Sequence, residues 1–244
     1  MHDEPRILSA FFGLDDSLPI SAATLCKGAA GQDGMPVTFS RRVSVTDVPA
    51  SAFRVHTAAG ETHTPLCATL SPATEDTERH TVLLVGQFGG EPNDPPAEVE
   101  VVSDLPLEGG TSALGLTGPV TPLIAGPTLL IGLRFDPADI ASDCPAGTKS
   151  VVQVTWAGGV SAPGGGDLGE LQRIRHRVLL ADGGGGAMEV IPTALADLAD
   201  NDNYVQLCIN EGLTPLSVRV EANTVVDPRG DLNPTTTIEL VDGP

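Results

Sequence analysis

The sequence has few aromatic residues and few basic ones. Only one residue is Trp, one is Tyr and six are Phe, so aromatics make up 3% of the 244 residues. Thirteen Lys and Arg stand against 32 Asp and Glu, which gives a formal net charge of −19. A charge of this sign and size repels phosphate backbones and anionic membrane surfaces. We therefore expect no nucleic acid among the partners.

Long apolar runs and local enzyme motifs are also lacking. No run of eighteen or more apolar residues is present, so the sequence predicts no membrane span. The first residues, MHDEPRILSAFFGLDDSLP, lack the basic and apolar regions of a signal peptide. We expect a secreted, periplasmic or cell-surface protein whose mature chain is seen without its signal peptide. No nucleophile elbow, phosphate-binding loop or H-E-x-x-H motif occurs, so hydrolase, nucleotide and metalloprotease chemistry have no local support.

Turn-forming residues and short apolar segments dominate the remainder. Hydrophobic residues make up 41% of the chain, with 28 Gly and 21 Pro. Helical periodicity is weak, and its best candidate, residues 192–200, spans barely two turns. Short strand-like segments bounded by Gly, Pro, Asp or Asn favour an all-β protein of antiparallel β-sandwiches. The expected strands are 35–45, 51–57, 80–88, 97–105, 127–135, 149–160, 175–183, 203–210, 213–226 and 235–241.

The spacing of these strands suggests two domains. Residues 106–127 are rich in Gly and Pro and poor in strand signals, and residues 136–148 interrupt the strand pattern again. We expect an N-terminal sandwich over 1–140 and a C-terminal sandwich over 141–244. The alternative is one large β-sandwich, because such folds can exceed two hundred residues.

The four cysteines predict disulfide bonds. Cys26, Cys67, Cys144 and Cys208 are widely separated and form no C-x-x-C pair, which argues against a zinc site. Four cysteines allow three connectivities, and two domains would favour Cys26–Cys67 and Cys144–Cys208, one in each domain. The alternative is four buried thiols.

Residues from about 37 to 88 resemble the bacterial Ig-like domains of surface-layer and other exported proteins. The matching positions are Phe39, Ser40, Val43, Phe53, Val55, Gly60, Thr81, Val82 and Leu84. Arg41 and Arg42 stand where that family commonly has an acidic residue and a proline. The resemblance implies a β-sandwich and says little about activity.

Residues from about 149 to 242 are similar in strand order to a fibronectin type III domain. In this comparison Trp156 is the buried ring and Tyr204 the phenol at a strand edge. Both resemblances imply adhesion, spacing, or contact with a protein or carbohydrate surface partner.

Oxygen-bearing side chains gather before one predicted strand and predict a calcium site. Ca²⁺ takes six to eight oxygen ligands, which clustered carboxylates and Asn carbonyls supply. Asn201 belongs to this first cluster, and a second acidic turn that contains Asn233 could lie at the same end of the sandwich and complete the coordination shell. The alternative is that Asp and Asn only cap and turn the chain. The expected calcium ligands are Asp197, Asp200, Asp202, Asn203, Asp227 and Asp231.

Three histidines give an alternative metal site. A hairpin turning at residues 58–61 would place His56 opposite His63, with His80 on the following strand. Neutral imidazoles in such a group could hold Zn²⁺ or Cu²⁺, whereas solvated surface histidines are the ordinary explanation.

One basic stretch interrupts the acidic sequence, with Arg173, Arg175, His176 and Arg177 close together. It is either a cationic strand face paired with nearby carboxylates or a contact surface for an anionic partner. Taken together, the residues favour an exported binding or structural protein. The alternative is an enzyme on a β-sandwich scaffold, with a metal or an Asp/His site in an interdomain cleft. The sequence leaves the oligomeric state open.

Overall fold

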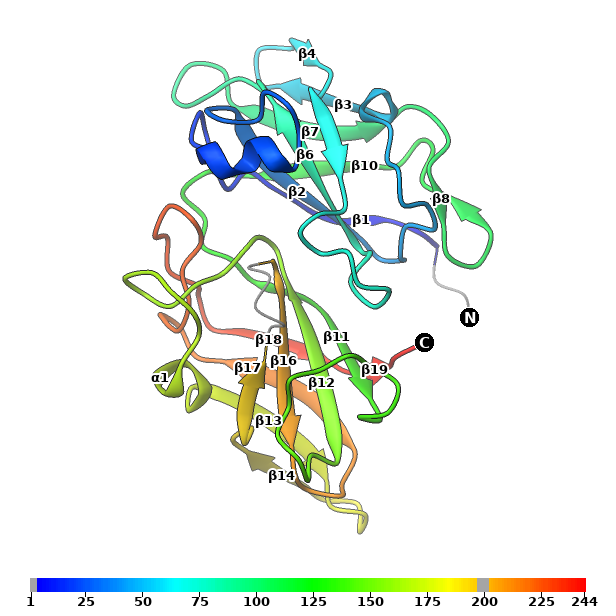
Figure 1. The fold of residues 1–244 in the computed structure, drawn as a ribbon, viewed down its shortest axis with the longest axis vertical. Helices are drawn as coiled ribbons and strands as arrows, with labels where there is room; N and C mark the ends of the chain where they lie inside the picture. The colour runs from blue at the N-terminus through cyan, green and yellow to red at the C-terminus, as the bar shows by residue number, and fades with distance from the viewer. Residues whose placement is uncertain (1–3, 197–201) are drawn as a thin grey trace. The chain divides into compact units, whose positions relative to one another are not determined.

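Strands form nearly all of the regular structure in the computed structural model, which describes residues 4–196 and 202–244 (Figure 1). The all-β prediction is confirmed. The strands belong to two units, Met1–Ile124 and Ala125–Pro244, each with its own core. No helix of the described residues is long and apolar enough to cross a membrane.

One sheet of eight strands forms the first unit, in the order β4-β3-β7-β10-β1-β2-β6-β5. All neighbours are antiparallel except β1 and β10, which are parallel. The elements are β1 (Ile7–Phe11), η1 (Ile20–Thr24), β2 (Asp33–Phe39), η2 (Ala50–Ala52), β3 (Phe53–Thr57), β4 (Thr62–His63), β5 (Cys67–Thr69), β6 (Thr81–Gly86), β7 (Pro96–Val101), the small pair β8 (Pro106–Leu107) and β9 (Thr111–Ser112), and β10 (Thr117–Thr121).

Alternate residues of these strands build one core. In β3 the side chains of Phe53 and Val55 are fully buried, whereas those of Arg54 and His56 are only partly buried, as period-two alternation requires. Val37 of β2 and Val99 of β7 belong to the same buried cluster. Both halves of the eight-stranded sheet therefore contribute to one interior.

The Gly/Pro-rich segment that appeared poor in strands contains a central one. β10 lies between β7 and β1, with Pro119 opposite Glu98 and Val120 opposite Ala10. Proline cannot donate a backbone hydrogen bond, so a strand of sequence TGPVT has a weak sequence signal. Its place in the sheet depends on tertiary pairing rather than on local propensity.

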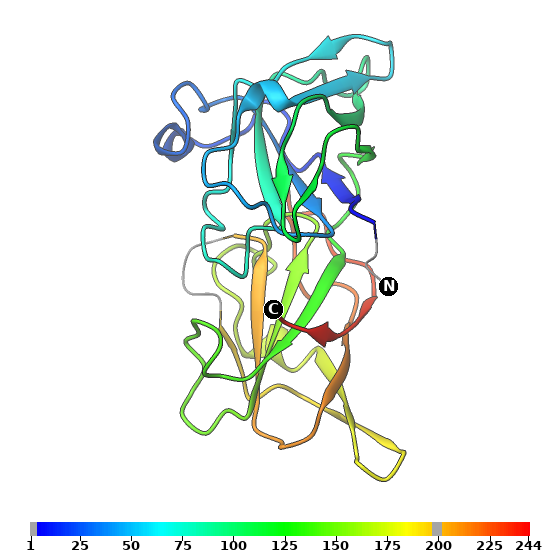
Figure 2. The same ribbon diagram turned by 90° about the vertical axis from the view of Figure 1, so that its right-hand side faces the viewer.

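Two sheets form the second unit. A five-stranded sheet has the order β15-β16-β12-β11-β19, and a four-stranded sheet has the order β14-β13-β17-β18. Figure 2 shows the β13–β14 hairpin (yellow) extending beyond its own sheet to a glycine-rich tip. The elements are β11 (Leu129–Phe135), β12 (Ser150–Trp156), α1 (Glu170–Arg173), β13 (His176–Ala181), β14 (Ala187–Val190), β15 (Ala194–Ala196), β16 (Tyr204–Ile209), β17 (Pro215–Val220), β18 (Thr236–Glu239) and β19 (Val241–Asp242).

The core of the second unit lies between these two sheets. Val154 and Trp156 of β12 share a buried cluster with Val178 of β13 and Val218 of β17. Trp156, expected as the buried ring, has no exposed surface. Residues 194–196, inside the best helical candidate, form strand β15 because they pair with β16.

The division between the units precedes the expected boundary. Residues 129–135 form β11, whose partner along its whole length is β12. Strand pairing therefore assigns this segment to the second unit, although the loop before Lys149 appears in the sequence as the stronger interruption.

Both disulfides form as the two-domain arrangement predicted. Cys26–Cys67 closes a separation of 41 residues in the first unit, and Cys144–Cys208 closes one of 64 residues in the second. Cys26 and Cys208 are both buried. The alternative of four buried thiols is wrong.

Candidate functional site

Asp202 and Asn203 are buried where the chain enters β16. Asp202 Oδ1 accepts the backbone N–H of Tyr204 at 2.6 Å. The Asn203 side chain donates to the Trp156 backbone carbonyl at 2.7 Å, while the backbone N–H of Trp156 donates to the Asn203 backbone carbonyl at 2.8 Å. These contacts fix the start of β16 against the end of β12. Asp197 and Asp200, two further expected ligands, lie outside the described residues.

Asp227 closes the second acidic turn on itself. Its Oδ1 accepts the backbone N–H groups of Arg229 and Asp231, both at 2.9 Å. Burial raises the pKa of Asp227, whereas these backbone hydrogen bonds act in the opposite direction. Its Oδ2 is buried without a hydrogen-bond partner. The turn alone explains the Oδ1 contacts, and Oδ2 is the oxygen left for a cation.

The two acidic segments both adjoin Ser161. Ser161 and Val226 exchange backbone hydrogen bonds of 3.0 Å in each direction, and Ser161 lines a pocket together with Asp202. Within the described ranges, however, Asp202, Asp227 and Asp231 do not bring three ligand oxygens within 4.8 Å of one another. Calcium binding by these residues stays a prediction.

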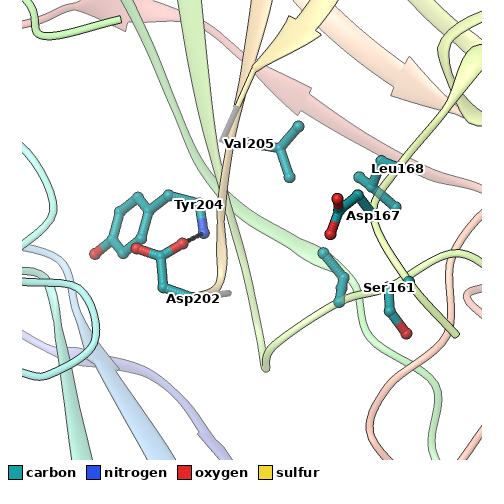
Figure 3. A pocket seen from close by; sticks show the side chains of 8 residues that line it. Ser161, Asp167, Leu168, Asp202, Tyr204 and Val205 are labelled. Carbon is teal, nitrogen blue, oxygen red and sulfur yellow. Dashed lines mark hydrogen bonds between the residues drawn. The ribbon is translucent and has the colours of Figure 1, made fainter. Parts of the chain in front are cut away.

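The pocket beside Asp202 is small and partly apolar. It has a volume of about 70 Å³, and its lining residues include Val160, Leu168, Val205 and Asp167. Figure 3 shows Val205 and Tyr204 pointing to opposite sides of β16, so that the tyrosine ring turns away from Leu168 and Asp167. A space of this size suits a few waters or a small ion.

A cluster of three carboxylate side chains, which the sequence analysis did not identify, lies in the first unit. Asp15, Asp16 and Asp33 place their oxygens within 4.8 Å of one another. Asp33 is 1% exposed; its Oδ1 accepts the N–H of Asp16 at 2.8 Å and its Oδ2 that of Phe88 at 2.7 Å. Burial raises the pKa of Asp33, backbone hydrogen bonds oppose this, and the charges of the other two aspartates add to it. Three converging carboxylates are suitable ligands for a hard cation such as Ca²⁺.

The three histidines do not come together. His56 stands opposite Thr62, and His63 stands opposite Val55, so the expected cross-strand pairing of His56 with His63 is wrong by one residue. A shift of one residue places the two imidazoles on opposite faces of the hairpin. His80 is buried, its Nδ1 lies 3.1 Å from the Phe39 carbonyl, and burial lowers its pKa to about 4.

His56 instead takes part in a chain of polar contacts. Its Nδ1 lies 3.0 Å from Thr62 Oγ1, and its Nε2 lies 3.0 Å from Glu100 Oε2. Thr62 is exposed on β4, and Glu100 comes from β7 on the other side of β3. Hydroxyl, imidazole and carboxylate thus lie in one row across three strands.

A larger cavity in the first unit is lined by charged side chains. It has a volume of about 250 Å³, and its walls include Arg42, Ser44, Asp76, Arg79 and Glu108. Arg42 Nε and Nη2 donate to the two carboxylate oxygens of Glu108 at 3.0 and 2.5 Å, and its Nη1 donates to the Asp76 carbonyl at 2.8 Å. Arg79 pairs with the Asp76 carboxylate at 2.7 Å.

The charges of this cavity stabilise one another. The hydrogen bonds from Arg42 lower the pKa of Glu108, and the same bonds raise the pKa of Arg42. Both groups therefore stay ionised near neutral pH. The cavity presents fixed donors and fixed acceptors side by side.

The basic stretch is paired within its own unit. Arg173 binds Glu170 at 2.6 Å, and Arg177 lies 3.5 Å from both Glu189 and Glu221. His176 is fully buried, and burial lowers its pKa to about 4. The expected pairing with nearby carboxylates holds for Arg173 and Arg177, but of the three arginines only Arg177 lies on a strand, because Arg173 ends α1 and Arg175 precedes β13.

Comparison with known proteins adds no family assignment. No protein-family model matches the chain, and no curated protein matches it.

Proposed function

We propose that this chain is an exported or cell-surface protein that acts by binding or by structural contact, built from two Ig-like or fibronectin III-like units. The observation that carries the proposal is that each unit is closed by a disulfide of its own. Disulfides form and persist in oxidising compartments outside the cytosol. The acidic surface and paired surface charges suit a protein that stays dissolved and makes selective contacts.

Fractionation of the producing cells tests this function. We expect the protein in the extracellular or surface fraction, with all four cysteines protected from a thiol-alkylating reagent until a reductant is added. Recovery from the cytosol with four reactive thiols would overturn the proposal, because the disulfides would then be absent in the cell.

Calcium binding remains part of the proposal at two alternative places. The segment with Asp202 and Asp227 was expected from the sequence, and the group around Asp33 offers a second set of oxygens. Thermal melts after EDTA treatment and after Ca²⁺ addition test binding, since a ligand of the folded state raises the unfolding temperature. Asp227→Asn and Asp33→Asn then show which place is used.

A second candidate function is favoured by the Thr62–His56–Glu100 chain. A hydroxyl beside an imidazole that a carboxylate orients is the arrangement that activates a nucleophile. Such an enzyme would form an acyl-ester on Thr62, detectable by mass spectrometry after incubation with p-nitrophenyl acetate. His56→Gln should abolish that adduct, whereas His63→Gln, on the other face of the hairpin, should not. Equal labelling in both variants would exclude the enzyme.

A further inference from the structure

The charged cavity of the first unit has the properties of a preorganised binding site. Arg42 donates three hydrogen bonds to two different segments, so its guanidinium has little freedom to lose when a ligand arrives. Its side chain is 20% exposed, and that of Arg79 is 26% exposed, so both line the cavity without being fully covered.

Hydrogen-bonding capacity remains at this cavity after the internal contacts are made. Arg79 has its Nε buried, and its carboxylate partner in the described part of the chain is Asp76, bound through Nη2, so only the terminal nitrogens of its guanidinium can reach a ligand. The Asp76 side chain is 83% exposed. The Ser44 side chain is also exposed at the cavity wall. Donors and acceptors are therefore both available to a ligand.

The positive and negative side chains that line the cavity balance one another, which favours a neutral ligand that carries hydroxyl groups. Two guanidinium groups face two carboxylates, so a charged ligand would have to compete with an existing ion pair. A hydroxyl group donates one hydrogen bond and accepts others, and so it can bind a carboxylate and a guanidinium together. The net charge of −19 further disfavours anionic glycans.

The cavity is open to solvent on one side, and its size suits a single small unit of a ligand. Its volume of about 250 Å³ lies below the roughly 300–1,000 Å³ of pockets for drug-sized molecules. No aromatic ring is among its lining residues in the described structure, so stacking on a sugar ring contributes nothing. Affinity should then be weak, at about 1 mM, which suits repeated contacts along a polymer.

We propose that this cavity binds one neutral sugar unit of a carbohydrate. The proposal rests on the proposed binding function and names its ligand class. Arg79 and Asp76 supply the ligand's donor and acceptor contacts, and the Arg42–Glu108 pair forms the rigid wall behind them.

Titration of the full chain with methyl glucoside, methyl galactoside and methyl mannoside tests the proposal by ¹⁵N–¹H NMR. At least one glycoside should shift the amides of Val43, Ser44 and Asp76 saturably at about 1 mM. Arg79→Met keeps the aliphatic stem and removes the guanidinium, and it should weaken binding about tenfold.

Arg173→Met is the matched control, because Arg173 also pairs with a carboxylate three residues earlier and is similarly exposed, but lies in the second unit. It should leave the titration unchanged. The proposal is overturned if none of the three glycosides shifts these amides up to about 50 mM. It is equally overturned if Arg79→Met binds like the parent, or if acetate or butylammonium saturates the same amides at lower concentration. A negative result in this titration would not contradict export of the protein, because cell fractionation tests export separately.

Discussion

Removal of the Cys144–Cys208 disulfide should destabilise the second unit by about 4 kcal/mol. The bond closes a separation of 64 residues, and the loop-entropy relation for a chain of that length gives about 4 kcal/mol at 25 °C. The variant is Cys144→Ala with Cys208→Ala, since alanine introduces no polar atom at the buried position 208.

Trp156 makes this effect measurable in the second unit alone. It is the only Trp of the chain, lies in the second unit and is fully buried, so its fluorescence reports the unfolding of that core. Urea titration of the parent and the variant gives the two unfolding free energies by linear extrapolation. Cys26→Ala with Cys67→Ala is the control, and it should move the Trp156 transition much less. A loss below about 1 kcal/mol in the first variant would refute the argument, because the bond would then constrain little of the unfolded chain.

Three further predictions follow from single groups. His80 and His176 each have a pKa lowered to about 4 by burial, so the unfolded chain takes up the proton first as the pH falls. The free energy of unfolding should keep its full value above about pH 6.5 and should fall by about 2 kcal/mol for each histidine between pH 7 and 5. Urea titrations at the two pH values measure this fall, and a fall that is equally large in His176→Gln would contradict the prediction. Asn233→Ala should cost about 2–4 kcal/mol in the same assay, because the Asn233 amide makes four hydrogen bonds to backbone groups and is 1% exposed. If Ca²⁺ binds beside Asp227, its addition should raise the Trp156-detected melting temperature, and Asp227→Asn should remove that rise; an unchanged rise in Asp227→Asn would exclude this place.

Period-two alternation made the fold class predictable, and the two units made the disulfide pairing predictable. Phe53 and Val55 point inward on β3 as expected, and Cys144 meets Cys208 across a 64-residue separation once both lie in one unit. The sequence did not predict β10, because Gly118 and Pro119 weaken the strand pattern of that segment, and β10 is defined by its pairing with neighbouring strands. Local sequence patterns therefore predicted the layered β fold but did not identify every strand.

The sites were less predictable because they depend on register and on distant segments. A register one residue from the expected one separated His56 from His63 and placed His56 against Thr62. Asp33 begins β2, whereas Asp15 and Asp16 lie in a bend after β1, and no spacing rule links these positions.

The charged cavity had one signal in the sequence. Arg42 stands where the Ig-like resemblance would have another residue type, and it is the residue that organises the cavity with Glu108. Its partner lies 66 positions away, so the pair itself could be found only in the structure.

Disulfide mapping of protein recovered from outside the producing cells tests the central claim most directly. Proteolysis without reduction, followed by mass spectrometry, should give two linked peptide pairs, Cys26 with Cys67 and Cys144 with Cys208. Free thiols, or a bond joining a cysteine of the first unit to one of the second, would contradict an exported protein of two separately closed β units.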